Sequence, residues 1–160
     1  MRPKVQKLFV APGNPGMTEL AECIPVETPK TLELASFAIS AKIDLTVVGP
    51  ESPLVAGIVD YFQDRKIPIF GPTRSAARLE GSKAFAKQLM EKMEVPTARF
   101  RVFRELDEAL KFLETSAIPI VVKADGLAGG KGAIVAENRE EAVKAVNSIL
   151  GERIFGEAGG

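Results

Sequence analysis

Four glycines and two lysines gather between two apolar runs in the second half of the chain. The glycines fill four of the seven positions from Gly126 to Gly132, Lys131 stands among them, and Lys123 precedes them. Glycine lets successive backbone N–H groups turn inward and lets a ligand approach closely. Together with two ammonium groups, such donors form a site for a polyphosphate. The pattern therefore predicts that this loop binds phosphate.

This loop differs from two familiar phosphate-binding sequences. A Walker A loop would need glycine where Asp125 stands and serine or threonine where Gly132 stands. The chain also contains no Gly-x-Gly-x-x-Gly sequence, and a strand rather than a helix is expected after the loop. Phosphates would therefore lie under a mobile hairpin, without help from a helix N-terminus. On residue types alone, a flexible hairpin whose lysines serve solubility is the alternative.

Apolar runs on both sides of the loop predict a hairpin. Residues 118–122 and 133–136 are rich in β-branched side chains and are bounded by turn residues, as strands are. Ser82 is expected to cap an earlier helix that ends before Pro96. The other predicted elements are helices over residues 108–114 and 139–150 and a half-exposed strand over residues 99–103. The second half is therefore expected to be α+β, with an antiparallel sheet.

The first half alternates between strands and helices. The predicted elements are strands over residues 7–11, 44–48 and 67–70, and helices over residues 29–42 and 54–65. Thr28 is expected to cap the first of these helices. Because the links between elements are short, the pattern favours a parallel sheet with right-handed crossovers.

Two of these strands end in Gly-Pro corners that offer candidate substrate contacts. Glu51 and Thr73 follow the corners, and open α/β sheets bind ligands at the carboxyl ends of their strands. A glutamate beside a helix start can equally complement the helix dipole, and Gly-Pro is common in turns. For Glu51 both interpretations stand.

Composition predicts a soluble globular protein. The 160 residues, 46% hydrophobic and 26% charged, suffice for one domain or two small ones, and we expect a boundary near residues 79–81. The 21 basic and 21 acidic residues cancel, which leaves no electrostatic footprint for nucleic acid or an anionic membrane. The absence of histidine excludes His-dependent triads. The single cysteine, Cys23, fits a reducing and hence cytoplasmic compartment.

Five motifs, in order and in register, resemble the phosphoribosylamine–glycine ligases, ATP-grasp enzymes of purine synthesis. They are Pro12-Gly-Asn-Pro-Gly16, Asp44-Leu-Thr-Val-Val-Gly-Pro-Glu51, Ile69-Phe-Gly-Pro-Thr73, Leu79-Glu-Gly-Ser-Lys-Ala-Phe85 and Val122-Lys-Ala-Asp-Gly-Leu-Ala-Gly-Gly-Lys-Gly132. The resemblance runs from Pro3 to the end of the chain. It implies an α/β fold in two parts. Residues 1–79 would form a parallel-sheet pre-ATP-grasp domain that lacks its first strand, and residues 80–160 the α+β first lobe of an ATP-grasp domain.

The resemblance also implies a reaction and its partners. In this family ATP phosphorylates the glycine carboxylate, and the amine of 5-phosphoribosylamine attacks the glycyl phosphate to give glycinamide ribonucleotide, ADP and phosphate. ATP and Mg²⁺ or Mn²⁺ are the implied cofactors, with the metal ligands outside this chain. Only small-molecule partners are implied, with no nucleic acid and no membrane, and the full-length enzyme is expected to be a monomer.

The same resemblance implies which residues bind ATP and substrate, and it assigns no catalytic residue. Lys83 and Lys123 would contact the nucleotide phosphates beneath a closing loop. The loop consists of Gly126, Leu127, Ala128, Gly129, Gly130, Lys131 and Gly132. The side that holds the phosphoribosyl substrate would contain Gly13, Asn14, Gly16, Gly49, Pro50 and Glu51. Three positions depart from the family, since Gly129 and Pro15 each replace an alanine and Met17 replaces a threonine.

The resemblance further predicts an internal fragment of a longer enzyme. The family has a strand and a Gly-Gly-Arg-Glu-His loop before the position of Met1. Beyond the position of Gly160 it has the segment that holds adenine and ribose and a Glu/Asn metal pair. The missing strand would lie in the middle of the parallel sheet, and the chain alone would not catalyse ligation. The alternatives are a non-catalytic nucleotide-binding fragment and another ATP-grasp ligase, such as a biotin-dependent carboxylase subunit. The Gly-Pro-Glu and Leu-Glu-Gly-Ser-Lys motifs argue against the latter.

Overall fold

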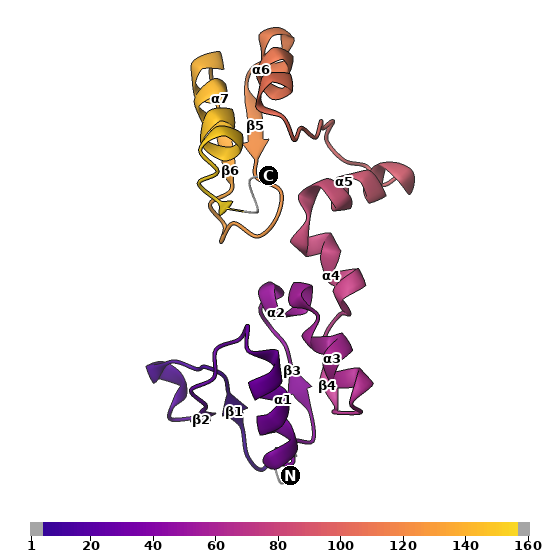
Figure 1. The fold of residues 1–160 in the computed structure, drawn as a ribbon, viewed down its shortest axis with the longest axis vertical. Coiled ribbons are helices and arrows are strands. Elements are labelled where there is room, and N and C mark those ends of the chain that lie inside the picture. The colour runs from indigo at the N-terminus through magenta and orange to yellow at the C-terminus, as the bar shows by residue number, and fades with distance from the viewer. Residues whose placement is uncertain (1–4, 157–160) are drawn as a thin grey trace. The chain divides into compact units, whose positions relative to one another are not determined.

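The computed structural model describes residues 5–156 and divides into two units, one ending at Ala77 and one beginning at Arg78 (Figure 1). The division falls within α4 (Arg74–Gly81), the helix that also contains the boundary expected from sequence. Pro3 and the last four residues, which the resemblance included, lie outside the described residues. Within residues 5–156, no helix combines the length and the hydrophobicity needed to cross a bilayer.

The first unit alternates short strands with helices. In chain order its elements are β1 (Phe9–Val10), a 3₁₀ turn (Pro15–Met17), β2 (Glu22–Cys23), α1 (Thr31–Ser40), β3 (Thr46–Val47), α2 (Glu51–Ala56), α3 (Ile58–Asp64) and β4 (Ile69–Phe70). β1 pairs with β2 and β3 pairs with β4, both in parallel. This confirms the predicted α/β class, although β2 has no counterpart among the strands expected from sequence.

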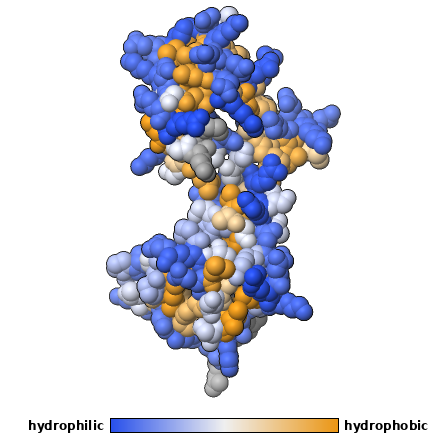
Figure 2. Space-filling view, viewed as in Figure 1, coloured by the Kyte–Doolittle hydropathy of each residue, from blue (hydrophilic) through white to orange (hydrophobic). Residues whose placement is uncertain are grey.

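The two parallel pairs form separate sheets of two strands each. The resemblance predicted such a gap, because the strand it lacks would lie between them. One face of the β3–β4 pair is open to solvent. Val47 and Phe70, which are partners in the ladder, are 66% and 68% exposed. Apolar side chains thus reach the surface of this unit (Figure 2).

The core of the first unit forms around α3. Val59 and Phe62 on this helix are fully buried, and they lie on one face because they are three residues apart. They belong to a cluster that includes Ala35 and Ala38 of α1. Such small side chains let the helices approach closely. Residues of α1, α2 and α3 pack in one cluster with Val48 and Ile69 beside β3 and β4. This packing holds the turns that follow the two strands in place.

Two predicted helices differ from the structure. The helix expected over residues 54–65 is divided into α2 and α3 by Gly57 at φ +95°, a left-handed conformation that glycine adopts without steric cost. α1 begins three residues beyond Thr28, so the prediction that Thr28 caps it was wrong. The reason is a turn before the helix, in which the Lys30 N–H donates to the Glu27 carbonyl at 3.0 Å.

A β-hairpin and two helices form the core of the second unit. In chain order the elements are α5 (Lys83–Lys92), α6 (Leu106–Thr115), β5 (Ile120–Lys123), β6 (Ala133–Ala136), α7 (Arg139–Val146) and a π-helical turn (Asn147–Gly151). β5 and β6 are antiparallel, as predicted, and α6 and α7 pack against one of their faces. The strand expected over residues 99–103 is not formed, since these residues have no strand partner in the described part of the chain.

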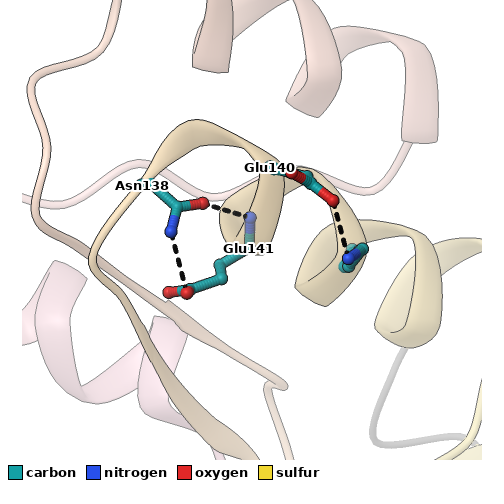
Figure 3. A network of polar contacts seen from close by, with 4 residues as sticks. Asn138, Glu140 and Glu141 are labelled. Atoms are coloured by element: carbon teal, nitrogen blue, oxygen red, sulfur yellow. Dashed lines mark hydrogen bonds and ion pairs between the residues drawn. The ribbon is translucent and has the colours of Figure 1, made fainter.

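Reciprocal contacts between Asn138 and Glu141 explain why α7 begins where it does (Figure 3). Asn138 Oδ1 accepts a hydrogen bond from the Glu141 N–H at 2.9 Å. The Glu141 carboxylate in turn accepts bonds from the Asn138 amide at 2.8 Å and from the Glu137 N–H at 2.9 Å. Glu140 and Lys144, one turn apart, form an ion pair at 2.8 Å. The contacts of Asn138 and Glu141 fix the start of α7 directly after β6, and the apolar cluster around Ala142 and Val146 packs the helix against the hairpin.

We expect Gly71→Ala to destabilise the first unit. A Cβ at Gly71 would lie 2.9 Å from Leu54 Cδ2 and 3.1 Å from Val59 Cγ2, inside the core. Overpacking of this kind costs about 1–3 kcal/mol, so the midpoint of urea unfolding should fall. Gly49→Ala is the control, because Gly49 lies in the turn two residues after β3 and its Cβ would meet no described atom within 4 Å. Equal midpoints for the two variants would contradict this packing.

Candidate functional site

The glycine loop joins β5 to β6, and hydrogen bonds fix its base (Figure 1). Directly after the strand ladder, the Ala124 N–H donates to the Gly132 carbonyl at 2.7 Å. Nearer the tip, the Lys131 N–H donates to the Ala128 carbonyl at 3.0 Å. The loop is therefore a formed turn on a paired base, and not a free tether between two strands.

The glycines of this loop serve two different purposes. Gly129 and Gly130 have φ values of +55° and +78°, and a Cβ on either would meet no described atom within 4 Å. These two residues supply a backbone conformation that other residues rarely adopt. Gly132 supplies space, because its Cβ would lie 2.5 Å from the Ala128 Cβ. The tip of the loop is thus open, while its base is closely packed.

One face of the hairpin beside the loop is apolar and exposed. Val121 on β5 and Val135 on β6 are ladder partners and are 49% and 60% exposed. Lys123 lies two residues beyond Val121 and therefore on the same face, at the start of the loop. Ile120 and Val122 point the other way and pack against α6 and α7. A ligand can thus meet an apolar surface, an ammonium group and the loop amides together.

Lys83, the first residue of α5, reaches the loop from a distant part of the sequence. Its Nζ donates to the Gly126 carbonyl at 2.8 Å. The structure thereby brings one of the two predicted phosphate lysines to the start of the loop, and the other, Lys123, ends the strand that leads into it. Lys131 is exposed within the loop itself.

Asp125 makes further contacts that sequence reasoning missed. Its carboxylate accepts hydrogen bonds from the Ser82 hydroxyl, at 2.9 and 3.2 Å to its two oxygens, and from the Ala84 N–H at 2.8 Å. Ser82 Oγ also accepts from the Phe85 N–H at 3.0 Å, which confirms Ser82 as the N-cap of α5. A carboxylate placed directly before Gly126 was the signal available, but nothing local in the sequence relates it to a residue 43 positions away.

The asparagine turn after β1 is closely packed. Asn14 Oδ1 accepts a hydrogen bond from the Gly16 N–H at 3.0 Å and so caps the 3₁₀ turn. Gly13 lies against β2, where its Cβ would be 2.5 Å from Cys23 Sγ. Of the predicted phosphoribosyl contacts, Gly13, Asn14 and Gly16 therefore form one structured turn that follows a parallel strand.

The second predicted substrate turn follows β3, a strand of the other sheet. Gly49 precedes Pro50, which is the N-cap residue of α2, and Glu51 is exposed in the first turn of that helix. This position suits both interpretations of Glu51, because a carboxylate there complements the helix dipole and also faces solvent. Thr73 Oγ1 lies 3.5 Å from the Ala76 N at the start of α4.

Comparison with known proteins decides the family. Residues 1–80 match the family model described as phosphoribosylglycinamide synthetase, N domain, and residues 81–160 match the one described as phosphoribosylglycinamide synthetase, ATP-grasp (A) domain. The chain belongs to the phosphoribosylglycinamide synthetase family. This confirms the resemblance drawn from the five motifs and excludes the alternative of a biotin-dependent carboxylase subunit.

Curated members of the phosphoribosylglycinamide synthetase family match almost the whole chain. The phosphoribosylamine–glycine ligase of Pseudomonas aeruginosa is 50% identical over 159 residues, which cover 98% of this chain and 37% of that protein. The one from Caldanaerobacter subterraneus is 48% identical over 156 residues, with the same coverage. The chain therefore spans little more than a third of the length of these relatives.

Solved structures agree with this assignment. A phosphoribosylamine–glycine ligase from Thermotoga maritima matches with a TM-score of 0.70 and 32% identity, over 94% of this chain and 35% of that one. The biotin carboxylase domain of a 2-oxoglutarate carboxylase from Hydrogenobacter thermophilus matches with a TM-score of 0.67 and 21% identity. This match covers 86% of this chain and 32% of that one. The latter identity supports a shared fold alone. The chain thus has the α/β fold of these proteins, and its second half belongs to the ATP-grasp domain.

We expect Gly132→Ala to loosen the base of the loop. The new methyl group would overlap Ala128, and overpacking of about 1–3 kcal/mol corresponds to roughly tenfold faster opening. Amide exchange of Ala124, whose N–H donates to the Gly132 carbonyl, reports this opening by NMR. Gly129→Ala is the control: its Cβ meets no described atom, so the strain of its φ of +55° stays at the tip of the loop, and exchange at Ala124 should rise less than in Gly132→Ala. A faster exchange in the control than in Gly132→Ala would reverse the assigned roles.

Proposed function

We propose that this chain forms part of a phosphoribosylamine–glycine ligase and binds the phosphates of ATP. The reaction joins glycine to 5-phosphoribosylamine and yields glycinamide ribonucleotide, ADP and phosphate through a glycyl phosphate. The observation that carries the proposal is the glycine loop with Lys83 bonded at its start and Lys123 beside it. The names of the curated relatives support the choice of reaction.

The loop suits a ligand of high negative charge. A carboxylate oxygen is a poor leaving group, so amide formation from glycine requires prior transfer of a phosphoryl group. Such a transfer depends mainly on positioning and on electrostatic stabilisation of the migrating group. In the proposed complex, the amides of Gly129 and Gly130 and the ammonium groups of Lys83 and Lys123 supply this stabilisation. Lys131 adds a third positive charge in the loop.

The exposed face of the hairpin suits the base of the nucleotide. Val121 and Val135 form a flat apolar surface next to Lys123. An aromatic base that lies on this surface removes both side chains from water, at a gain of about 25 cal/mol per Å² of apolar area. The phosphates of the same molecule would then extend past Lys123 to the loop. ATP is for this reason preferred to a simple phosphate as the ligand.

The turns of the first unit are proposed to hold the phosphoribosyl substrate. Gly13, Asn14 and Gly16 follow β1, and the Gly49–Glu51 turn follows β3. Both lie after the carboxyl ends of parallel strands, where open α/β sheets bind ligands. The backbone N–H groups of such turns bind phosphate without a charged side chain. Met17 offers no hydroxyl to such a group, so backbone contacts would carry the binding.

The remaining proposals concern the metal, the compartment and the assembly. Mg²⁺ or Mn²⁺ is implied by the family, yet residues 5–156 contain no group of three or more Cys, Asp or Glu side chains that could hold a metal ion. We propose that the ligands of this metal lie outside these residues. Since ATP and phosphorylated sugar amines are cytoplasmic metabolites, we propose a cytoplasmic enzyme with small-molecule partners, monomeric at full length.

Lys123→Ala should weaken ATP binding. Loss of a charge-assisted contact to phosphate costs about 1.5–3 kcal/mol, which raises the Kd of ATP roughly tenfold or more. Titration calorimetry of the 160-residue chain measures this change. Lys111→Ala removes the same charge from an exposed position on α6 and is the control. If both variants bind ATP with the affinity of the parent chain, Lys123 is not a phosphate ligand.

The purified 160-residue chain should not catalyse ligation. The described residues lack a metal-binding cluster, and the relatives that bear the ligase name are more than twice as long. We expect no release of ADP that depends on both glycine and phosphoribosylamine, measured by a coupled ADP assay. ATP binding by the same preparation serves as the control for folded protein. Steady, substrate-dependent turnover would refute this expectation, whereas binding without turnover fits it.

A further inference from the structure

Asp125 links the start of α5 to the start of the glycine loop. Its carboxylate accepts the Ser82 hydroxyl and the Ala84 N–H, from residues 41 to 43 positions earlier in the chain. All three residues are partly buried. The carboxylate is thus shared between two elements that are close in space and distant in sequence.

Lys83 lies between the two residues that Asp125 holds. The backbone on both sides of Lys83 is therefore fixed against the loop, while its ammonium group donates to the carbonyl of Gly126, the residue after Asp125. Ser82, Lys83 and Ala84 at the start of α5 thus contact Asp125 and Gly126 at the start of the loop. In this arrangement the position of the Lys83 side chain depends on the Asp125 carboxylate.

Asp125 also occupies part of the N-terminus of α5. The N-terminus of a helix such as α5 is a ready site for phosphate. Here the carboxylate of Asp125 accepts the Ala84 N–H at the N-terminus of α5. The positive end of the helix dipole therefore partly balances the negative charge of Asp125. The N-terminus of α5 therefore has one N–H fewer to offer an anion.

We propose that Asp125 is a positioning residue for nucleotide phosphates: it holds α5 against the loop so that Lys83 reaches the phosphates beneath it. The inference rests on the proposed function, and it adds a residue that makes no contact with the ligand. If Asp125 only stabilised the helix, its loss would weaken every ligand alike. A positioning role predicts a selective loss for ligands that carry phosphates.

The experiment compares ATP with adenosine in the 160-residue chain. Asp125→Ala should raise the Kd of ATP about tenfold, which is the effect of one charge-assisted contact, while the Kd of adenosine changes less than about twofold. The Kd of ATP for Asp125→Asn should fall between those of the parent chain and Asp125→Ala, because the amide oxygen can still accept the Ala84 N–H. Asp107→Asn, which removes an exposed carboxylate from the first turn of α6, should leave both affinities unchanged. An equal loss for ATP and adenosine in Asp125→Ala would overturn the inference.

A double-mutant cycle with Lys83→Ala tests the route by which Asp125 acts. If Asp125 works through Lys83, removing Lys83 costs much less ATP affinity in the Asp125→Ala background than in the parent chain. Additive losses would overturn the inference. Circular dichroism checks that each variant folds, and Asp125→Asn replaces Asp125→Ala in the cycle if the latter does not. A parent chain that binds no ATP would overturn the proposed function itself, whereas ATP binding that is unaltered in Asp125→Ala would overturn this inference alone.

Discussion

Pairing between β5 and β6 is the constraint on which the candidate site depends. The ladder runs through four residue pairs, from Ile120 opposite Ala136 to Lys123 opposite Ala133, and it ends where the loop begins. A glycine-rich segment loses more conformational entropy on ordering than any other. The paired strands limit that cost, because both ends of the loop are already fixed. Since α6 and α7 cover only one face of the hairpin, the other face is available to a ligand.

The positive charge at the candidate site comes from residues of the site itself. The formal net charge of the chain is zero, so the attraction of a polyphosphate must come from groups at the loop and not from the protein as a whole. Lys83, Lys123 and Lys131 supply the positive charge, and the loop amides add partial charges that need no counter-ion. The carboxylate of Asp125, which lies beside Lys83 and the loop, is engaged by Ser82 and Ala84. A negative group can therefore stand next to a phosphate site without opposing the ligand at full strength.

Elements with a strong local signal could be predicted from the sequence. The hairpin followed from two β-branched runs around glycines, and the cap of α5 followed from Ser82. Features without such a signal were missed. β2 is only two residues long and shows no alternation, and the division between α2 and α3 depends on the backbone of a single glycine, Gly57. Thr28 looked like a cap, but a turn ending at Lys30 delays the helix.

The candidate site was predictable in its parts and not in its assembly. The loop glycines and Lys123 are neighbours in sequence, so residue types alone indicated their chemistry. Lys83 entered only through the resemblance to a family, because 43 residues separate it from Gly126. Asp125 belonged to the quoted motif but carried no expected role. Contacts over such separations are set by how α5 packs against the hairpin, which no local pattern of residues encodes.

The close packing at Gly132 has a genetic consequence. Every substitution of the first or second base of a glycine codon introduces a side chain or a stop codon. One nucleotide change is therefore enough to place a Cβ beside Ala128, at a contact that real Cβ atoms do not make. At the third base all changes are silent. In natural variants of this chain, the codon for Gly132 should accumulate third-base differences and almost no others.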